Sequence, residues 1–132
     1  MSRKKKAYIA GPISKGCLLR NVNQATAAFV ALAKAGLAPF CPHWSAYSKE
    51  AFFFPGVQSV DTRVFCEATR FGNTEMTHAD WMGVDLPWVE VSDAVLRLPG
   101  ESTGADLEVT HAIKCGIPVF YDIEELIAWS KA

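Results

Sequence analysis

The segment from Asp93 to Glu108 constrains the fold more than any other part of this sequence. It begins with a short apolar run, Ala94-Val-Leu-Arg-Leu98, which is bounded by Asp93 and by Pro99-Gly100. A run of this length and composition is typical of a strand that is covered on both faces of a parallel sheet. We therefore expect a buried strand, a turn, and then a helix that carries Glu108.

The loop after this strand is suited to bind an anion. Gly100 and Gly104 allow a ligand to approach the backbone, and Ser102 or Thr103 is expected to cap the next helix. The free N–H groups and the dipole at a helix N-terminus favour a group such as phosphate. Since no Lys follows Gly104, the loop is not a P-loop.

Glu108 lies more than one turn into this helix. The spacing of three and four residues places apolar side chains on one face that we expect to pack on the sheet, namely those of Ala105, Val109, Ala112 and Ile113. Glu108 lies at the border of that face, where a carboxylate is partly desolvated and faces the crevice at the strand ends. The same spacing also fits a solvated glutamate on the helix flank, so the local pattern leaves both interpretations open.

Strand and helix patterns alternate along the chain, which predicts an α/β fold with a parallel sheet and helices on its faces. A strand over 6–10 precedes a helix that Asn21 or Asn23 caps. In the next strand, 37–41, Pro39 indicates an edge position because it cannot donate to a central ladder. The later elements are helices over 60–71 and 76–89, the second of them kinked or restarted at Pro87, then a strand over 117–121 and a closing helix over 124–129.

Residues 42–59 are rich in aromatic side chains and have the pattern of a loop. They include Trp44, Tyr47 and the run Phe52-Phe53-Phe54. Three consecutive phenylalanines usually fill a core or an interface, and stacking on a base or covering a site is the alternative. The sequence alone does not decide between these roles.

Length and composition indicate one domain spanning residues 1–132. The chain has 132 residues and is 50% hydrophobic, which allows a real core and is too short for two domains. Four of the thirteen basic residues stand together in Arg3–Lys6, so the remainder is acidic although the formal net charge is −1. An acidic body argues against nucleic-acid binding, and we expect residues 1–5 to form a flexible, solubilising N-terminus.

Targeting signals and metal sites are not recognisable in the sequence. No apolar run approaches the ~18 residues of a membrane span, and nothing resembles a signal peptide, so we expect a cytoplasmic protein without membrane contact. In a reducing compartment the four cysteines are expected to be small buried thiols, namely Cys17, Cys41, Cys66 and Cys115. Cys41 and His43 have no second pair beside them, so we expect neither a metal nor another cofactor.

Three blocks of the chain carry a resemblance to a known family. They are Tyr8-Ile-Ala-Gly-Pro-Ile13, Asp85-Leu-Pro-Trp-Val-Glu-Val-Ser-Asp93, and Ser102-Thr-Gly-Ala-Asp-Leu-Glu108 followed by His111-Ala-Ile-Lys-Cys-Gly-Ile-Pro118. Together they resemble the nucleoside 2-deoxyribosyltransferase superfamily, and within it the 2′-deoxynucleoside 5′-monophosphate N-glycosidases. The resemblance covers most of the chain in family order. It implies a flavodoxin-like parallel sheet of about five strands, and cleavage of the bond between sugar and base.

The resemblance also implies catalytic roles. Glu108 matches the nucleophile that attacks the anomeric carbon, Asp85 matches the acid that protonates the departing base, and Tyr8 matches the tyrosine that positions the nucleophile. Water then releases the sugar phosphate, as in retaining glycoside hydrolysis with two carboxylates. Without the family resemblance, a helix cap just before the break at Pro87 is the alternative role of Asp85.

Ser102 points to a phosphorylated substrate. Superfamily transferases that act on nucleosides carry Asp six residues before the nucleophile, whereas the monophosphate hydrolases carry Ser, which with Gly104 accommodates the phosphate at the helix N-terminus. Gly11, Ile13 and Gly16 match positions that line the sugar-phosphate pocket. His43 matches a base-side histidine, with Trp44 beside it as a stacking plane, although an isolated histidine is more often structural.

The chain departs from the pattern of the family that it resembles at Ser14, where the most similar members place Arg, and in the longer segment 47–77. Sugar transfer to a second base is one alternative activity. Pro99–Gly104 with Glu108 is also loosely similar to the cytokinin-activating phosphoribohydrolases, and a nucleotide-binding protein without turnover is a third possibility. The family resemblance implies a homodimer with shared sites. The sequence does not identify the base or decide between deoxyribose and ribose.

Overall fold

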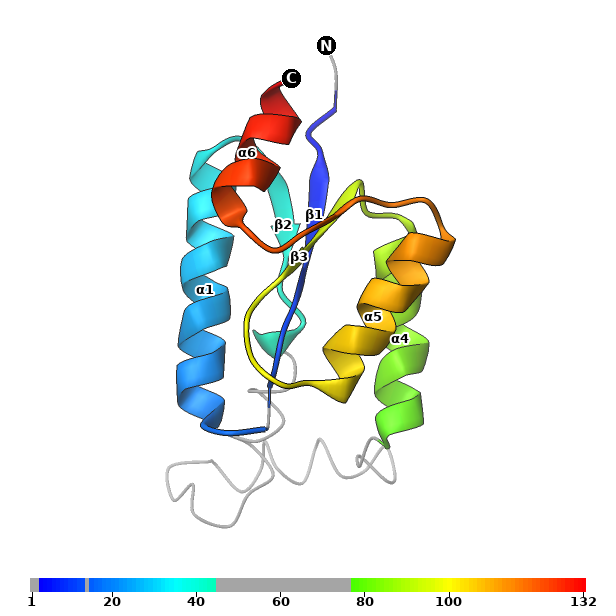
Figure 1. Cartoon of the computed structure of the whole chain (residues 1–132). Helices are drawn as coiled ribbons and strands as arrows, with labels where there is room; N and C mark the ends of the chain where they lie inside the picture. The colour runs from blue at the N-terminus through cyan, green and yellow to red at the C-terminus, as the bar shows by residue number, and fades with distance from the viewer. Residues whose placement is uncertain (1–2, 14, 45–76) are drawn as a thin grey trace, which may run out of the picture.

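The computed structural model describes residues 3–13, 15–44 and 77–132, which form an α/β structure around one parallel sheet (Figure 1). Four strands of this part of the chain form the sheet in the order β2-β1-β3-β4. The elements are β1 (Lys6–Ala10), α1 (Leu18–Lys34), β2 (Ala38–Phe40), α4 (His78–Glu90), β3 (Ala94–Arg97), α5 (Thr103–Lys114), β4 (Val119–Phe120) and α6 (Ile123–Lys131). The predicted α/β class is confirmed, and the four described strands are close to the expected five.

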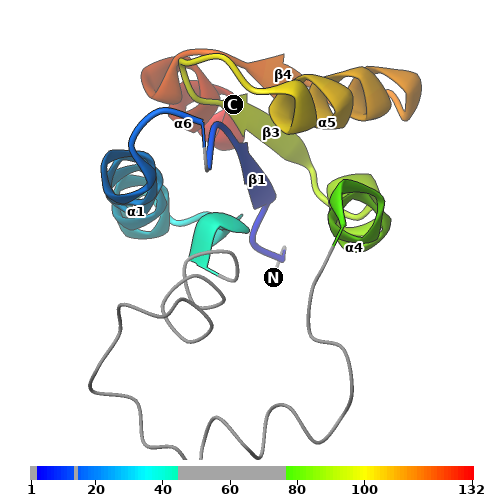
Figure 2. The same cartoon turned by 90° about the horizontal axis from the view of Figure 1, so that it is seen from below.

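Helices cover both faces of the sheet because side chains alternate along its strands. On one face, Ala7 and Ile9 belong to a buried cluster that includes residues of α1 and α6. On the other face, Tyr8 and Ala10 pack with residues of α4 and α5. Figure 2 shows α1 and α6 on one side of β1 and β3, and α4 and α5 on the other.

The central strands occupy the predicted positions. β1 has the bounds expected from sequence, and its register with β3 pairs Tyr8 with Val95. β2 is an edge strand, as Pro39 indicates, and it pairs with β1 alone among the described strands. β1 therefore lies in the interior of the sheet, where Tyr8 is fully buried.

α1 begins earlier than predicted. Its N-cap is Cys17, which makes no side-chain capping hydrogen bond, so the expectation that Asn21 or Asn23 caps this helix is wrong. Asn21 lies inside the helix, and its amide donates to the carbonyls of Ile13 at 2.9 Å and Lys15 at 2.8 Å. Asn21 thus holds the loop between β1 and α1, a contact across a turn that helix propensity does not reveal.

α4 runs through Pro87 without a break, so the predicted restart is wrong. The helix begins with a capping box in which Thr77 and Asp80 bond each other's backbone N–H. The proline deprives only the Gly83 carbonyl of a helical partner, and Gly83 is exposed, so water can bind that carbonyl. Asp85 consequently lies within a continuous helix and is not a cap.

α5 begins as predicted, with Ser102 as its N-cap. The prediction that Ile113 packs on the sheet is wrong, because Ile113 is 66% exposed. The buried residues of α5 are Ala105, Glu108 and Ala112. Since α4 packs against α5 on the Glu108 side, the buried stripe shifts toward Glu108 and leaves Ile113 in solvent.

The cysteines divide by position in the fold. Cys41 is buried as expected, but Cys17 and Cys115 are exposed because they cap the ends of α1 and α5. The predicted helix over 60–71, the phenylalanine run, Tyr47, Cys66 and Ser14 lie outside the described residues. Within the described part of the chain, no helix is long and apolar enough to cross a membrane.

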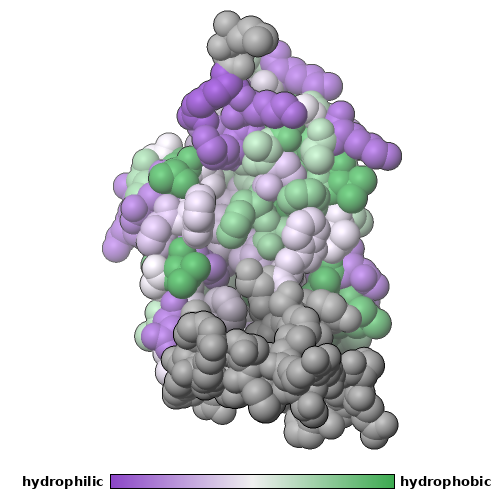
Figure 3. Space-filling model, turned by 180° about the vertical axis from the view of Figure 1, so that it is seen from behind, coloured by the Kyte–Doolittle hydropathy of each residue, from purple (hydrophilic) through white to green (hydrophobic). Residues whose placement is uncertain are grey.

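The basic N-terminus makes contacts with the domain. Arg3 donates to both carboxylate oxygens of Asp93, at 2.8 and 3.0 Å, and the Lys5 ammonium lies 4.3 Å from the centre of the Trp129 ring. Seen from behind, hydrophilic side chains gather at this end of the molecule, while hydrophobic and hydrophilic residues mix over the middle (Figure 3). Residues 3–5 therefore contact the folded domain.

Candidate active site

A cavity of about 330 Å³ lies at the carboxyl ends of β1 and β3, where parallel α/β sheets bind their ligands. Its walls come from the loop after β1, from one side of α4, and from the first turns of α5. The lining residues are Gly11, Ile13, Lys15, Pro42, His78, Trp81, Met82, Asp85, Ser102, Thr103, Gly104, Ala105 and Glu108. With Pro42, which follows β2, four segments that are distant in sequence form one site.

Tyr8 and Glu108 are hydrogen-bonded at the base of this cavity. Tyr8 is fully buried in β1, and its hydroxyl donates to Oε2 of Glu108, which is 5% exposed. The Tyr8 ring stacks on Phe40 with centroids 5.7 Å apart, which fixes the direction of the hydroxyl. Burial raises the pKa of Tyr8, so the hydroxyl remains a donor throughout the physiological pH range.

Burial also raises the pKa of Glu108, to about 8. The Tyr8 hydroxyl and the charge of Arg97 oppose this rise because both favour the carboxylate, whereas the charge of Asp85 adds to it. The solvated alternative for Glu108 is therefore wrong. A buried carboxylate with a fixed donor is suited to act as a nucleophile when it is ionised.

Asp85 is the second carboxylate of the cavity. It is 6% exposed on α4, and burial raises its pKa to about 6. Because the two carboxyls interact, their protons dissociate as those of a pair. Between about pH 6 and pH 8 the pair holds one proton. The two pKa values place this proton mainly on Glu108, so the form with Glu108 ionised and Asp85 protonated is the minor form in that range.

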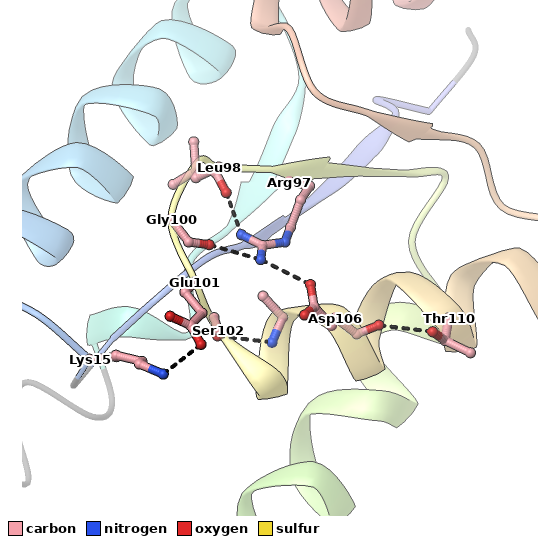
Figure 4. A network of polar contacts seen from close by, with 9 residues as sticks. Lys15, Arg97, Leu98, Gly100, Glu101, Ser102, Asp106 and Thr110 are labelled. Carbon is pink, nitrogen blue, oxygen red and sulfur yellow. Dashed lines mark hydrogen bonds and ion pairs between the residues drawn. The ribbon is translucent and has the colours of Figure 1, made fainter.

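The first turn of α5 lines another part of the cavity, and Figure 4 shows Ser102 at the start of this helix. The Ser102 hydroxyl accepts from the N–H of Ala105 at 3.1 Å, which leaves Thr103 and Gly104 at the open start of the helix. N–H groups in this position have no acceptor within the helix, and the dipole adds a partial positive charge. This end of the cavity is therefore suited to an anion.

Lys15 brings a cation to the same opening. Its ammonium lies 2.8 Å from a carboxylate oxygen of Glu101 in the loop before α5, and both side chains are largely exposed (Figure 4). An exposed pair of this kind contributes little to stability, so Lys15 can exchange Glu101 for a ligand anion at small cost. Lys15 is not among the site residues predicted from the sequence.

Most of the predicted site residues lie at the cavity, whereas three do not. Glu108, Asp85, Gly11, Ile13, Ser102 and Gly104 all line the cavity, and Tyr8 lies directly beneath Glu108. Gly16, His43 and Trp44 do not belong to the lining. Gly16 is exposed and has φ +84°, which places it in the left-handed region that glycine adopts readily.

His43 and Trp44 point to structural partners instead. His43 is fully buried and lies behind Gly11, and burial lowers its pKa to about 4. Its Nε2 lies 3.1 Å from the carbonyl of Pro12, which can only accept, so the neutral ring carries its proton on Nε2. The Trp44 indole donates to Thr26 of α1 at 2.9 Å and packs on Phe29.

The sequence predicted only Asp85 of the cavity wall that α4 forms. His78, Trp81, Met82 and Asp85 recur along α4 at helical spacing and all line the cavity. The signal that could have revealed this wall is the spacing of His78 and Trp81 relative to Asp85, which places the three side chains on one side of the predicted helix. A flat aromatic ring one turn before the acid gives this wall a surface for a planar group.

Among the residues that the structure describes, no three His, Cys, Asp or Glu side chains are placed to hold a metal ion. Comparisons with known protein families and with curated proteins find no match for this chain.

Proposed function

We propose that this protein hydrolyses the N-glycosidic bond of a nucleoside 5′-monophosphate and releases the free base and the sugar 5-phosphate. The observation that carries the proposal is the buried Glu108, held by Tyr8 and coupled to Asp85, in one cavity with the capped start of α5. A pair of carboxyls that shares one proton near neutral pH is what general acid and nucleophile require. The resemblance to the monophosphate N-glycosidases supports the same reaction.

The first chemical step breaks the bond to the base. The form that reacts is the minor one, in which the shared proton lies on Asp85. Ionised Glu108 then attacks C1′ of the sugar through a carboxylate oxygen, and the electron pair of the C1′–N bond passes to the base. Asp85 gives its proton to the base, so that a neutral base leaves. Tyr8 keeps Glu108 oriented and favours the ionised form of its carboxyl, because the hydroxyl donates to Oε2.

The second step releases the sugar. A water molecule gives its proton to the Asp85 carboxylate and attacks C1′, and the bond between C1′ and Glu108 breaks. Both carboxyls return to their starting states, as in retaining glycosidases. The resemblance favours deoxyribose, and the reaction is chemically the same for ribose.

The anion-binding end of the cavity, formed by Lys15 and the start of α5, supports a phosphorylated substrate. Ser102 is neutral and is already engaged as the helix cap, so it adds no repulsive charge at the start of α5. Lys15 supplies a positive charge at the same opening. A cavity of about 330 Å³ also falls within the range of small-molecule sites. Trp81 and Met82, on the same helix as Asp85, offer the apolar wall for the base.

The test is chromatographic detection of free base after incubation with deoxy- and ribonucleoside monophosphates, including modified pyrimidines. Glu108→Gln removes the nucleophile with little change in shape, and Glu125→Gln removes an exposed glutamate of α6 as the matched control. We expect base release by the wild type and by Glu125→Gln, and none by Glu108→Gln. Unchanged release by Glu108→Gln contradicts the mechanism.

Two other outcomes identify the alternatives. Base exchange that requires a second added base indicates a deoxyribosyltransferase, which uses the same nucleophile. Nucleotide binding without base release, equal for wild type and Glu108→Gln, indicates a nucleotide-binding protein. Ser102 favours hydrolysis of a monophosphate over transfer between nucleosides, because the transferases carry a negatively charged Asp at the matching position.

A further inference from the structure

Arg97 is a buried charge in an otherwise apolar strand. The preceding residues of β3 are at most 1% exposed, and Arg97 itself is 9% exposed. Burying a guanidinium group is costly unless its N–H groups find acceptors. The proposed reaction assigns no step to Arg97, so its position calls for an explanation.

The guanidinium group of Arg97 joins two points of the loop between β3 and α5 to the first turn of α5 (Figure 4). It donates to the carbonyl of Leu98, to the carbonyl of Gly100 at 3.0 Å, and to Oδ1 of Asp106 at 3.0 Å. These acceptors lie at the start of the loop, at its turn and in the first turn of α5. A planar fork of donors can hold three such points in one geometry, which a lysine cannot.

The opposite side of the loop is held by the loop after β1. Gly100 has φ +116°, and a Cβ atom there would lie 2.8 Å from Cγ of Pro12. The loop is therefore fixed between Arg97 on one side and Pro12 on the other. Ser102 and Gly104, which follow this loop turn, line the anion-binding end of the cavity.

Arg97 also changes the electrostatics of this end of the cavity. Asp106 lies in the first turn of α5, where its charge would repel an anion, and its ion pair with Arg97 offsets that charge. The charge of Arg97 also lowers the pKa of Glu108, against the larger rise caused by burial. One side chain thus acts on the shape and on the charge of the site.

We propose that Arg97 is a positioning residue for the anionic part of the ligand: it holds the loop between β3 and α5, and the first turn of α5, in the geometry that receives a phosphate group. This inference rests on the proposed function, because the anion is the 5′-phosphate of the substrate. Arg97 acts through backbone groups of the loop and through Asp106.

The test measures the affinity for ribose 5-phosphate by calorimetry in three full-length variants. Arg97→Met removes the charge and the donors, Arg97→Lys keeps the charge and loses the fork, and Arg20→Met removes an exposed charge of α1 as the control. We expect Arg97→Met to bind at least about tenfold more weakly and Arg97→Lys about threefold more weakly, because a displaced binding loop loses its preorganisation. Arg20→Met should bind like the wild type.

A second measurement separates positioning from a loss of structure. The titration of Glu108, followed by NMR of its side-chain carboxyl carbon, should move to higher pH in Arg97→Met and stay in place in Arg97→Lys. Partial unfolding would lower the bound fraction without moving that midpoint. If Arg97→Met does not fold, Arg97→Lys decides the question, since it keeps the buried charge.

Two results overturn the inference. One is unchanged affinity: every Arg97 variant that folds binds ribose 5-phosphate as tightly as the wild type. The other is a wild type that does not bind this ligand. If the wild type binds ribose 5-phosphate in an Arg97-dependent way but releases no base from any nucleotide, the proposed hydrolysis fails and the inference about Arg97 stands.

Discussion

Replacing Glu108 by Gln should make the protein more stable at neutral and alkaline pH. Burial raises the pKa of Glu108 from 4.5 to about 8, so the folded protein holds this proton more tightly than the unfolded chain does. Stability therefore falls as pH rises from about 4.5, where the unfolded chain begins to ionise, through about 8, where the folded protein loses the proton. Gln keeps the shape of protonated Glu and does not titrate.

The size of this effect follows from the two pKa values. Each pKa unit corresponds to about 1.4 kcal/mol, so the wild type loses on the order of 3 kcal/mol between pH 4 and pH 7, and about 4 kcal/mol by pH 8, through Glu108 alone. Near pH 4 the two proteins should be about equally stable. At pH 8 the variant should exceed the wild type by several kcal/mol, a large part of the stability of a typical domain.

Urea unfolding followed by tryptophan fluorescence, repeated from pH 4 to pH 8, measures this difference. Glu125→Gln serves as the control, because this glutamate is exposed on α6 and its replacement should leave the difference from the wild type flat across the range. Parallel stability curves for wild type and Glu108→Gln would refute the argument that Glu108 is desolvated. The result does not depend on whether the protein is an enzyme.

The remaining predictions concern turnover and the loops. The pH profile of kcat/KM should be bell-shaped with limbs near 6 and 8, because the pair of Asp85 and Glu108 must hold one proton; a rate that rises steadily above pH 9 would contradict this. Tyr8→Phe should lower kcat roughly 10- to 100-fold with little change in KM, since a hydrogen bond to a charged group is worth about 1.5–3 kcal/mol. Gly100→Ala should cost at least about 1 kcal/mol in a thermal melt, because its φ of +116° and the 2.8 Å approach to a neighbouring side chain both oppose a Cβ atom, and an unchanged melting temperature would contradict that view. Ser102→Asp should weaken use of a monophosphate more than use of the nucleoside, measured as the ratio of the two kcat/KM values, because it adds a negative charge at the start of α5.

The sequence by itself determined the local structure of this protein. The apolar run of β3, the Ser102 cap and the edge position that Pro39 indicates all rest on interactions within a few residues, which composition and spacing record directly. The predictions failed where a residue contacts a partner outside its own helix or strand. Asn21 holds the preceding loop rather than capping its helix.

Only the tertiary structure decided the properties of the site. Sequence spacing placed Glu108 at a border that fits either solvent or cavity, and the packing of α4 against α5 buries it. The hydrogen bond from Tyr8, one hundred positions away, depends on β1 lying inside the sheet. Burial and proximity depend on how whole elements pack, whereas periodicity describes one element at a time. The same packing directs Trp44 toward α1 and brings Trp81 and Lys15 to the cavity.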